Sequence, residues 1–232
     1  MQMQQKKKIK GFTIIELLVV IAIIAVISGA AIPQFANWSK ERAVKNSAER
    51  IKDLAVSINS QVQRGLYGFA QFSIIPLADD EGYSFQTNGM LMSNLATNIS
   101  ETDDWHQTSV RCKNEDAFWD HLGASNNRAE VRSFNIDNVN TSIDNESGVC
   151  FSKDGSYFKA HGTLKNNLNV TVENRSTNQY LILCTTSNAS NGGKCPLDQG
   201  GGLEKPAYLV EWTRFGNISK FKWSGSDWTR QN

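Results

Sequence analysis

The chain has 232 residues, 40% of them hydrophobic and 20% charged, and it carries a formal net charge of +1. This composition indicates one or two folded units and excludes both a largely disordered chain and a protein with many membrane spans. The averages hide an asymmetry, because residues 12–32 contain one charged side chain, that of Glu16. A helix of this length would extend for about 30 Å, the thickness of the hydrocarbon core of a bilayer. We therefore expect a transmembrane helix over residues 12–33.

The segment before the apolar run, residues 1–11, is positively charged and contains no acidic residue. Its cations are Lys6, Lys7, Lys8 and Lys10. A positive cluster that flanks a first membrane span is retained in the cytoplasm. The rest of the chain is therefore expected on the outer side of the membrane.

All four cysteines lie in this exported part: Cys112, Cys150, Cys184 and Cys195. An even number of cysteines in an oxidising compartment favours disulfides over metal ligation, and three pairings are possible. We favour Cys184 with Cys195, which would close a short polar loop. Cys112 would then pair with Cys150 by elimination.

Glu16 needs an explanation, since a carboxylate in hydrocarbon costs about 2.5–3.5 kcal/mol even on lenient insertion scales. A plain membrane anchor, or a signal peptide cut after the small residues 29–31, would leave this cost uncompensated. A cut between Gly11 and Phe12 would instead create an α-amino cation one helical turn from Glu16. Such a cut would give the carboxylate a partner, in its own chain or in a neighbour.

The stretch Lys-Gly-Phe-Thr-Ile-Ile-Glu-Leu-Leu, residues 10–18, closely resembles the leader junction of type IV pilins and type II secretion pseudopilins. The resemblance implies that residues 1–11 are a leader peptide removed by a prepilin peptidase and that the new amine of Phe12 is methylated. It also implies that Glu16 contacts the Phe12 amine of an adjacent subunit during assembly. Pro33 matches the position where many pilin helices kink, and proline removes a helical hydrogen bond there.

The helix is expected to continue through residues 34–65, because apolar residues recur there at steps of three and four. They are Val44, Ala48, Ile51, Ala55, Ile58 and Val62. This spacing forms one stripe along a helix, and Gly65 is a stop signal. The stripe is expected to pack on a sheet of the same chain, with a coiled-coil partner as the alternative.

The remaining residues, 66–232, are expected to form a globular α+β head. Residues 66–147 are rich in Asn, Ser and Asp, so loops and short elements are expected, among them a short helix capped by Asn114. Strand patterns follow: a hairpin over residues 148–160 with Asp154-Gly155 at its turn, strands at 168–174 and 180–186, and a last hairpin that turns at Gly216-Asn217. The predicted fold is a long N-terminal helix packed by its second half on an antiparallel β-sheet.

Residues 148–155, Gly-Val-Cys-Phe-Ser-Lys-Asp-Gly, also resemble the hydrophobic-x-Phe-x-x-Asp-Gly hairpin that is common in the GspH/FimT branch of minor pilins and minor pseudopilins. The resemblance implies a minor subunit of this branch, with the Asn-rich middle of the chain as an insertion.

Catalytic motifs are missing from the sequence. A stretch similar to a phosphate loop, residues 190–195, lacks its first glycine because Asn188 stands there. His106, His121 and His161 lie in separate segments without the spacing of metal ligands. We therefore expect neither an enzyme nor a cofactor.

No metal site is expected either. Acidic residues gather at 79–81, 103–104 and 137–146, which raises calcium binding as an alternative. None of these stretches repeats the D-x-[DN]-x-[DN]-G spacing of a calcium loop.

DNA is a second candidate partner, because cations and aromatic rings alternate near the C-terminus. The candidate contacts are Arg214, Lys220, Lys222 and Trp223. Cations with stacking rings are typical of single-stranded nucleic acid sites. Two features oppose this interpretation: the Gly-Arg-x-Arg stretch of DNA-binding FimT-like pilins is replaced by Gly-Asn-Ile-Ser at residues 216–219, and 20 basic against 23 acidic side chains remain without residues 1–11.

The sequence therefore predicts a minor pilin, a structural subunit that joins or primes a type IV pilus together with other pilin subunits. Before assembly it would lie in the inner membrane with a periplasmic head, and afterwards in the pilus at the cell surface. The alternatives are a pseudopilin of a type II secretion system, located in a periplasmic pseudopilus, and a DNA-binding pilin that acts in DNA uptake.

Overall fold

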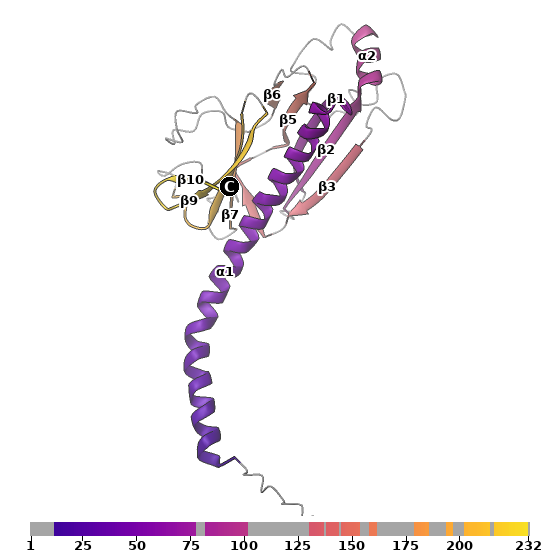
Figure 1. The fold of residues 1–232 in the computed structure, drawn as a ribbon. Helices are drawn as coiled ribbons and strands as arrows, with labels where there is room; N and C mark the ends of the chain where they lie inside the picture. The colour runs from indigo at the N-terminus through magenta and orange to yellow at the C-terminus, as the bar shows by residue number, and fades with distance from the viewer. Residues whose placement is uncertain are drawn as a thin grey trace, which may run out of the picture. The chain divides into compact units, whose positions relative to one another are not determined.

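The computed structural model describes residues 12–77, 82–101, 130–136, 138–143, 145–153, 158–161, 179–185, 194–196, 202–213 and 216–231. The chain divides into two compact units, one ending at Lys40 and the other beginning at Glu41. The elements, most of which are labelled in Figure 1, are α1 (Ile14–Gln63), β1 (Tyr67–Pro76), β2 (Tyr83–Leu91), α2 (Met92–Glu101), β3 (Glu130–Ile136), β4 (Val139–Thr141), β5 (Ser147–Ser152), β6 (Phe158–His161), β7 (Gln179–Thr185), β8 (Ala207–Trp212), β9 (Ile218–Trp223) and β10 (Trp228–Gln231).

The end of α1 is set by Gly65, as the sequence predicts. Gly65 has a φ of +78°, in the left-handed region that glycine adopts without strain. Its N–H donates to the carbonyl of Val62 (2.9 Å), and the N–H of Leu66 donates to the carbonyl of Gln61 (3.0 Å). These two bonds form a Schellman motif, which satisfies carbonyls at the end of the helix.

The apolar stripe in the second half of α1 is buried within the head, also as predicted. Every member of the stripe, from Val44 to Val62, is at most 1% exposed and belongs to one hydrophobic cluster. The helix therefore packs on strands of its own chain.

The first sheet, sheet A, has the strand order β3-β2-β1-β5-β6, and all its neighbouring strands are antiparallel. Here the prediction of loops and short elements over residues 66–147 is wrong for the long strands β1 and β2, whereas α2, β3 and β4 are short elements as predicted. The reason is that polar residues are buried in these strands. Asn88 of β2 donates from Nδ2 to Oε1 of Gln71 in β1 over 3.1 Å, and both side chains are at most 1% exposed. Such paired amides give a strand the composition of a loop.

The second sheet, sheet B, has the antiparallel order β10-β9-β8-β7-β4. The predicted strand at residues 180–186 is present as β7, and the predicted hairpin at Gly216 joins β8 to β9, with φ +75° at that glycine. A further hairpin, which the sequence analysis missed, adds β10. The strand predicted at 168–174, the helix after Asn114 and the turn at residues 154–155 lie outside the described residues, although β5 and β6 do pair as a hairpin.

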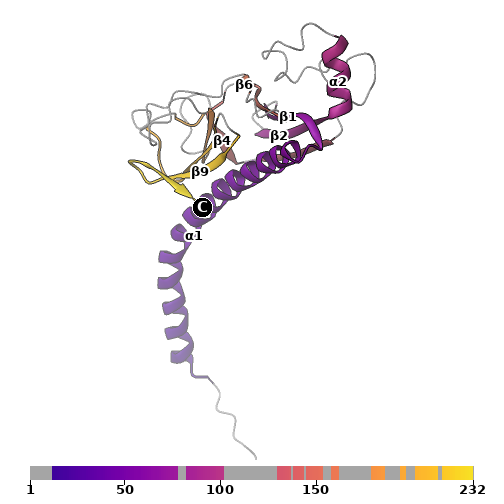
Figure 2. The same ribbon diagram turned by 45° about the horizontal axis from the view of Figure 1, so that its top comes forward.

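Two residues connect the sheets at their edges, between the end of β3 and the start of β4. Asn138, in this connection, has a φ of +59°, which asparagine tolerates better than most residues. The edge strand of sheet A therefore leads directly into the edge strand of sheet B, and α1 from residue 41 onward contacts both sheets (Figure 2).

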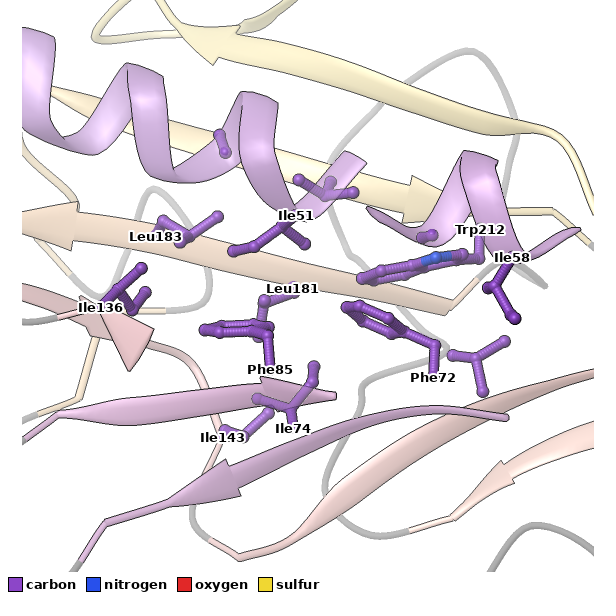
Figure 3. Packing of buried hydrophobic residues seen from close by; sticks show 14 of the residues in the cluster. Ile51, Ile58, Phe72, Ile74, Phe85, Ile136, Ile143, Leu181, Leu183 and Trp212 are labelled. Atoms are coloured by element: carbon purple, nitrogen blue, oxygen red, sulfur yellow. The ribbon is translucent and has the colours of Figure 1, made fainter. Parts of the chain in front are cut away.

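One core joins α1 and the two sheets, as Figure 3 shows. Ile51 of α1 lies among Phe85 of β2, Leu183 of β7 and Trp212 of β8, and the ring centroids of Phe72 and Trp212 are 5.6 Å apart. The predicted α+β architecture is confirmed, with two antiparallel sheets in place of one.

Candidate functional site

The first half of α1 presents apolar side chains to its surroundings. All large apolar residues from Phe12 to Ile27 are exposed, with exposed fractions between 42% and 83%. Contiguous apolar surface of this extent marks contact with a membrane or with other chains. No single described helix is both long and apolar enough to span a membrane, whereas the bent pair formed by Ile14–Gly29 and Gln34–Gln63 meets the criterion by length and composition.

Glu16, the one carboxylate of this half, lies in the first turn of α1 and is bonded to Thr13. The N–H of Thr13 donates to Oε2 of Glu16 over 3.5 Å, and the N–H of Glu16 donates to Oγ1 of Thr13 over 3.3 Å. This reciprocal arrangement is a capping box, which satisfies two N–H groups at the start of a helix. The sequence signal for it, a threonine followed three residues later by a glutamate, was available in residues 13–16 and was missed.

The capping box bears on the predicted pairing of Glu16 with the amine of Phe12. Gly11, on the other side of the predicted cut, lies outside the described residues. Thr13 and Glu16 both follow that cut, so removal of residues 1–11 would leave the capping box intact. The carboxylate thus has a weak polar partner in its own chain, the N–H of Thr13.

The bend of α1 lies between Gly29 and Gln34, in the segment that contains Pro33. A proline inside a helix removes one backbone hydrogen bond and favours a bend at that place. Phe35, two residues after Pro33, and Trp38 form an exposed aromatic pair whose ring centroids are 5.6 Å apart.

The two lysines proposed as DNA contacts are paired with acids of α1 instead. Nζ of Lys220 lies 2.6 Å from Oε1 of Glu49, and only 4% of the Lys220 side chain is exposed. Lys222 donates to Glu41 in the same way. These pairs, which we call the α1–β9 ion pairs, join the helix to sheet B across more than 170 residues of sequence.

The α1–β9 ion pairs shift the pKa values of their members. The hydrogen bond from Lys220 lowers the pKa of Glu49. The hydrogen bond to Glu41 raises the pKa of Lys222, whereas burial raises that of the neighbouring Tyr208. Both charged pairs are therefore favoured at neutral pH.

Trp223, the proposed stacking residue, is 1% exposed and belongs to a second hydrophobic cluster on sheet B. Its Nε1 donates to the carbonyl of Leu203 over 2.9 Å, and its ring lies 5.1 Å from that of Trp228. A ring in this position is not available to stack on a base, and Lys220 is neutralised by Glu49. Arg214 lies outside the described residues, so the candidate DNA contacts do not form a described site.

The same cluster contains the disulfide between Cys184 and Cys195, which confirms the first predicted pairing. Cys150 is also disulfide-bonded. Cys112 lies outside the described residues, so its predicted bond to Cys150 stays a prediction. In the described ranges, no group of three or more His, Cys, Asp or Glu residues could hold a metal ion.

Residues 6–32 match the family model described as the prokaryotic N-terminal methylation motif. This match covers the lysine cluster, Glu16 and the apolar segment, and it indicates a protein similar to type IV pilins and pseudopilins. No solved structure matches the chain.

Proposed function

We propose that this chain is a minor pilin, a structural subunit that is cut between Gly11 and Phe12, methylated at the Phe12 amine and built into a type IV pilus through α1. The observation that carries the proposal is the methylation motif at residues 6–32. It coincides with an exposed apolar helix that begins at the capping box of Thr13 and Glu16. A prepilin peptidase and other pilin subunits would be its partners.

The different surroundings of the two parts of α1 support this role. The apolar stripe after Glu41 is buried in the core of the head, whereas the large apolar side chains before Gly29 are exposed. The head therefore does not need the first part for its own core. That part is suited to bilayer contact before assembly and to contact with other subunits afterwards.

Glu16 would supply direction to this contact. A carboxylate surrounded by hydrocarbon gains most from a charged partner, and the one bond that the Glu16 carboxylate accepts from Thr13 is long, at 3.5 Å. The methylated amine of Phe12 in a neighbouring subunit would be a stronger partner than the Thr13 N–H. Replacement of the Thr13 N–H by this amine as the partner of Glu16 would set the register of the growing filament.

The intact mass and the N-terminal residue of the protein, isolated from its native membrane, test the proposal. A chain that begins at Phe12 and carries the mass of one extra methyl group supports it. A chain that begins at Met1, or after the small residues 29–31, would contradict it.

Glu16 variants test assembly separately from processing. Glu16→Ala and Glu16→Gln should both be cut and exported with a folded head, yet enter filaments poorly, because neither variant offers a charge to the Phe12 amine. Glu16→Asp, which keeps the charge, is the matched control and should retain part of the assembly. Filament levels in Glu16→Gln equal to those of the wild type would contradict the assigned role.

A pseudopilin of a type II secretion system is the second candidate, because the methylation motif and the Glu16 chemistry are common to both classes. Isolation of native filaments separates them: a minor pilin co-purifies with sheared surface pili, and a pseudopilin stays with the cell envelope. For either class we propose a structural and not an enzymatic role.

A further inference from the structure

We propose that Phe35 and Trp38 form an interfacial anchor that holds α1 at a fixed depth in the outer leaflet of the membrane before assembly. The partner of this aromatic pair is the headgroup region of the bilayer. The inference rests on the proposed function in one respect, namely that the first half of α1 lies in a membrane.

The first observation is the exposure of the pair. Phe35 is 67% exposed and Trp38 is 53% exposed, although the two rings contact each other. Both exceed the exposure of any other large apolar side chain of α1 between Phe35 and its end at Gln63; Val56 follows at 39%. Two large rings at this level of exposure mark a contact surface.

The second observation is the place of the pair in the charge pattern. Residues 17–39 contain no charged side chain, and Lys40 is the first charge after Glu16. The predicted span, residues 12–33, corresponds to about 33 Å along a helix, close to the thickness of about 30 Å of the hydrocarbon core. Phe35 and Trp38 follow the end of this span by two and five residues. A chain with Phe12 at one boundary and Glu16 inside the hydrocarbon therefore has this aromatic pair at the other boundary.

The chemistry of the pair suits that boundary better than either neighbouring phase. Tryptophan combines a large apolar ring with an N–H donor, and such rings gather at the level of the headgroups in membrane proteins. Lys40 follows within one turn and is exposed, so its ammonium can reach lipid phosphates while its stem stays apolar. Phe35, Trp38 and Lys40 thus match, in this order, the acyl chains, the interface and the phosphates of a lipid.

Depth-dependent quenching of Trp38 fluorescence tests the inference on the full chain. The protein is reconstituted in vesicles of phosphatidylcholine and phosphatidylglycerol that carry a nitroxide at the headgroup, near the glycerol backbone or at the end of an acyl chain. The chain has six tryptophans, so the signal of Trp38 is obtained as the difference between wild type and Trp38→Phe. We expect the strongest quenching by the nitroxide near the glycerol backbone and the weakest by the one at the chain end.

A matched pair of variants checks the role of the ring contact. Phe35→Ala should shift or broaden the depth profile of Trp38, because the second ring of the anchor is missing. Val56→Ala removes another exposed apolar side chain of α1 and should leave the profile unchanged.

Three results would overturn the anchor. Strongest quenching at the chain end would place Trp38 in the hydrocarbon core. Absence of quenching in a chain that floats with the vesicles would place Trp38 outside the bilayer. If quenching is absent and the Trp38 ring is also shielded from solvent more strongly as the protein-to-lipid ratio rises, the aromatic pair contacts a second copy of the chain. In these three cases the proposed function stands, whereas a chain that does not float with vesicles at all would contradict both proposals.

Discussion

At the scale of single residues, the acidic side chains of α1 are distinguished by the donors that surround them. Glu16 is exposed in an apolar segment, and its carboxylate accepts only one long hydrogen bond among the described residues, from the N–H of Thr13 at 3.5 Å. Glu49 has already met its cation, because Lys220 is almost fully buried beneath it at 2.6 Å. The same residue type therefore lies exposed in the apolar first part of the helix and fixes the helix to sheet B in the second part.

The pair of Glu49 and Lys220 predicts an unequal response to mutation. Glu49→Gln leaves a buried ammonium without its closest carboxylate and should lower the free energy of unfolding by about 1–2 kcal/mol, a value reduced because 41% of the Glu49 side chain is exposed. Lys220→Met replaces the buried cation with an apolar group of similar length and should cost less. Urea denaturation of both variants measures the difference, and a larger loss in Lys220→Met would contradict the explanation.

The α1–β9 ion pairs also predict how stability depends on pH. The pKa of Glu49 is lowered in the folded protein, so its contribution is present above the ordinary value of 4.5 and is lost as the pH falls through the lowered value. Lys222 has the opposite sign: its raised pKa gives a contribution that is present below 10.5 and is lost at higher pH. Denaturation at neutral pH and at about pH 3 should therefore show a smaller acid-induced loss in Glu49→Gln than in wild type.

At the scale of elements, the local sequence explains where α1 stops but not how its neighbouring strands pair. Gly65 ends the helix through its own backbone conformation. By contrast, β1 and β2 contain buried amides that are partnered across the two strands, as with Asn88 and Gln71. Local composition does not reveal such partners, which is why these strands were missed.

The termination at Gly65 predicts a specific order of variants. Gly65→Ala places a Cβ on a backbone with φ +78° and should destabilise the head by about 1 kcal/mol or more. Gly65→Asn is the control and should cost less, because asparagine tolerates the left-handed region. Thermal unfolding of the two variants provides the comparison, and equal losses would show that crowding against Lys153 is responsible instead.

At the scale of the whole molecule, residues 41–63 of α1 act as the shared support of two sheets. Ile51 is fully buried between side chains of sheet A and sheet B, so neither sheet has a complete core without the helix. The first half of α1 contributes nothing to this core and is left for contacts outside the head.

The shared core predicts that the head unfolds as one unit. Ile51→Ala should lower the free energy of unfolding by about 2–5 kcal/mol, and both sheets should lose their structure in the same transition. Val56→Ala, on the exposed face of the helix, should change it by less than about 0.5 kcal/mol. Separate transitions for tryptophan fluorescence, to which Trp212, Trp223 and Trp228 of sheet B contribute, and far-ultraviolet circular dichroism, which reports both sheets, would contradict a common core.

The sequence by itself determined the features that depend on near neighbours along the chain. These are the apolar segment with its single carboxylate, the stripe from Val44 to Val62, the stop at Gly65 and the disulfide that closes the loop from Cys184 to Cys195. Each follows from periodicity, backbone conformation or a short loop. The methylation motif belongs to the same class, because it is read from consecutive residues.

Only the tertiary structure decided which polar side chains are paired or buried inside the head. Lys220 and Trp223 have the composition of a nucleic acid site, yet a glutamate 171 residues away neutralises the first and a hydrophobic cluster buries the second. The division of the described strands into two sheets around α1 was decided in the same way. The physical reason is that ion pairs, buried amides and a shared core join residues that are distant in sequence, so their energies appear only when the chain has folded.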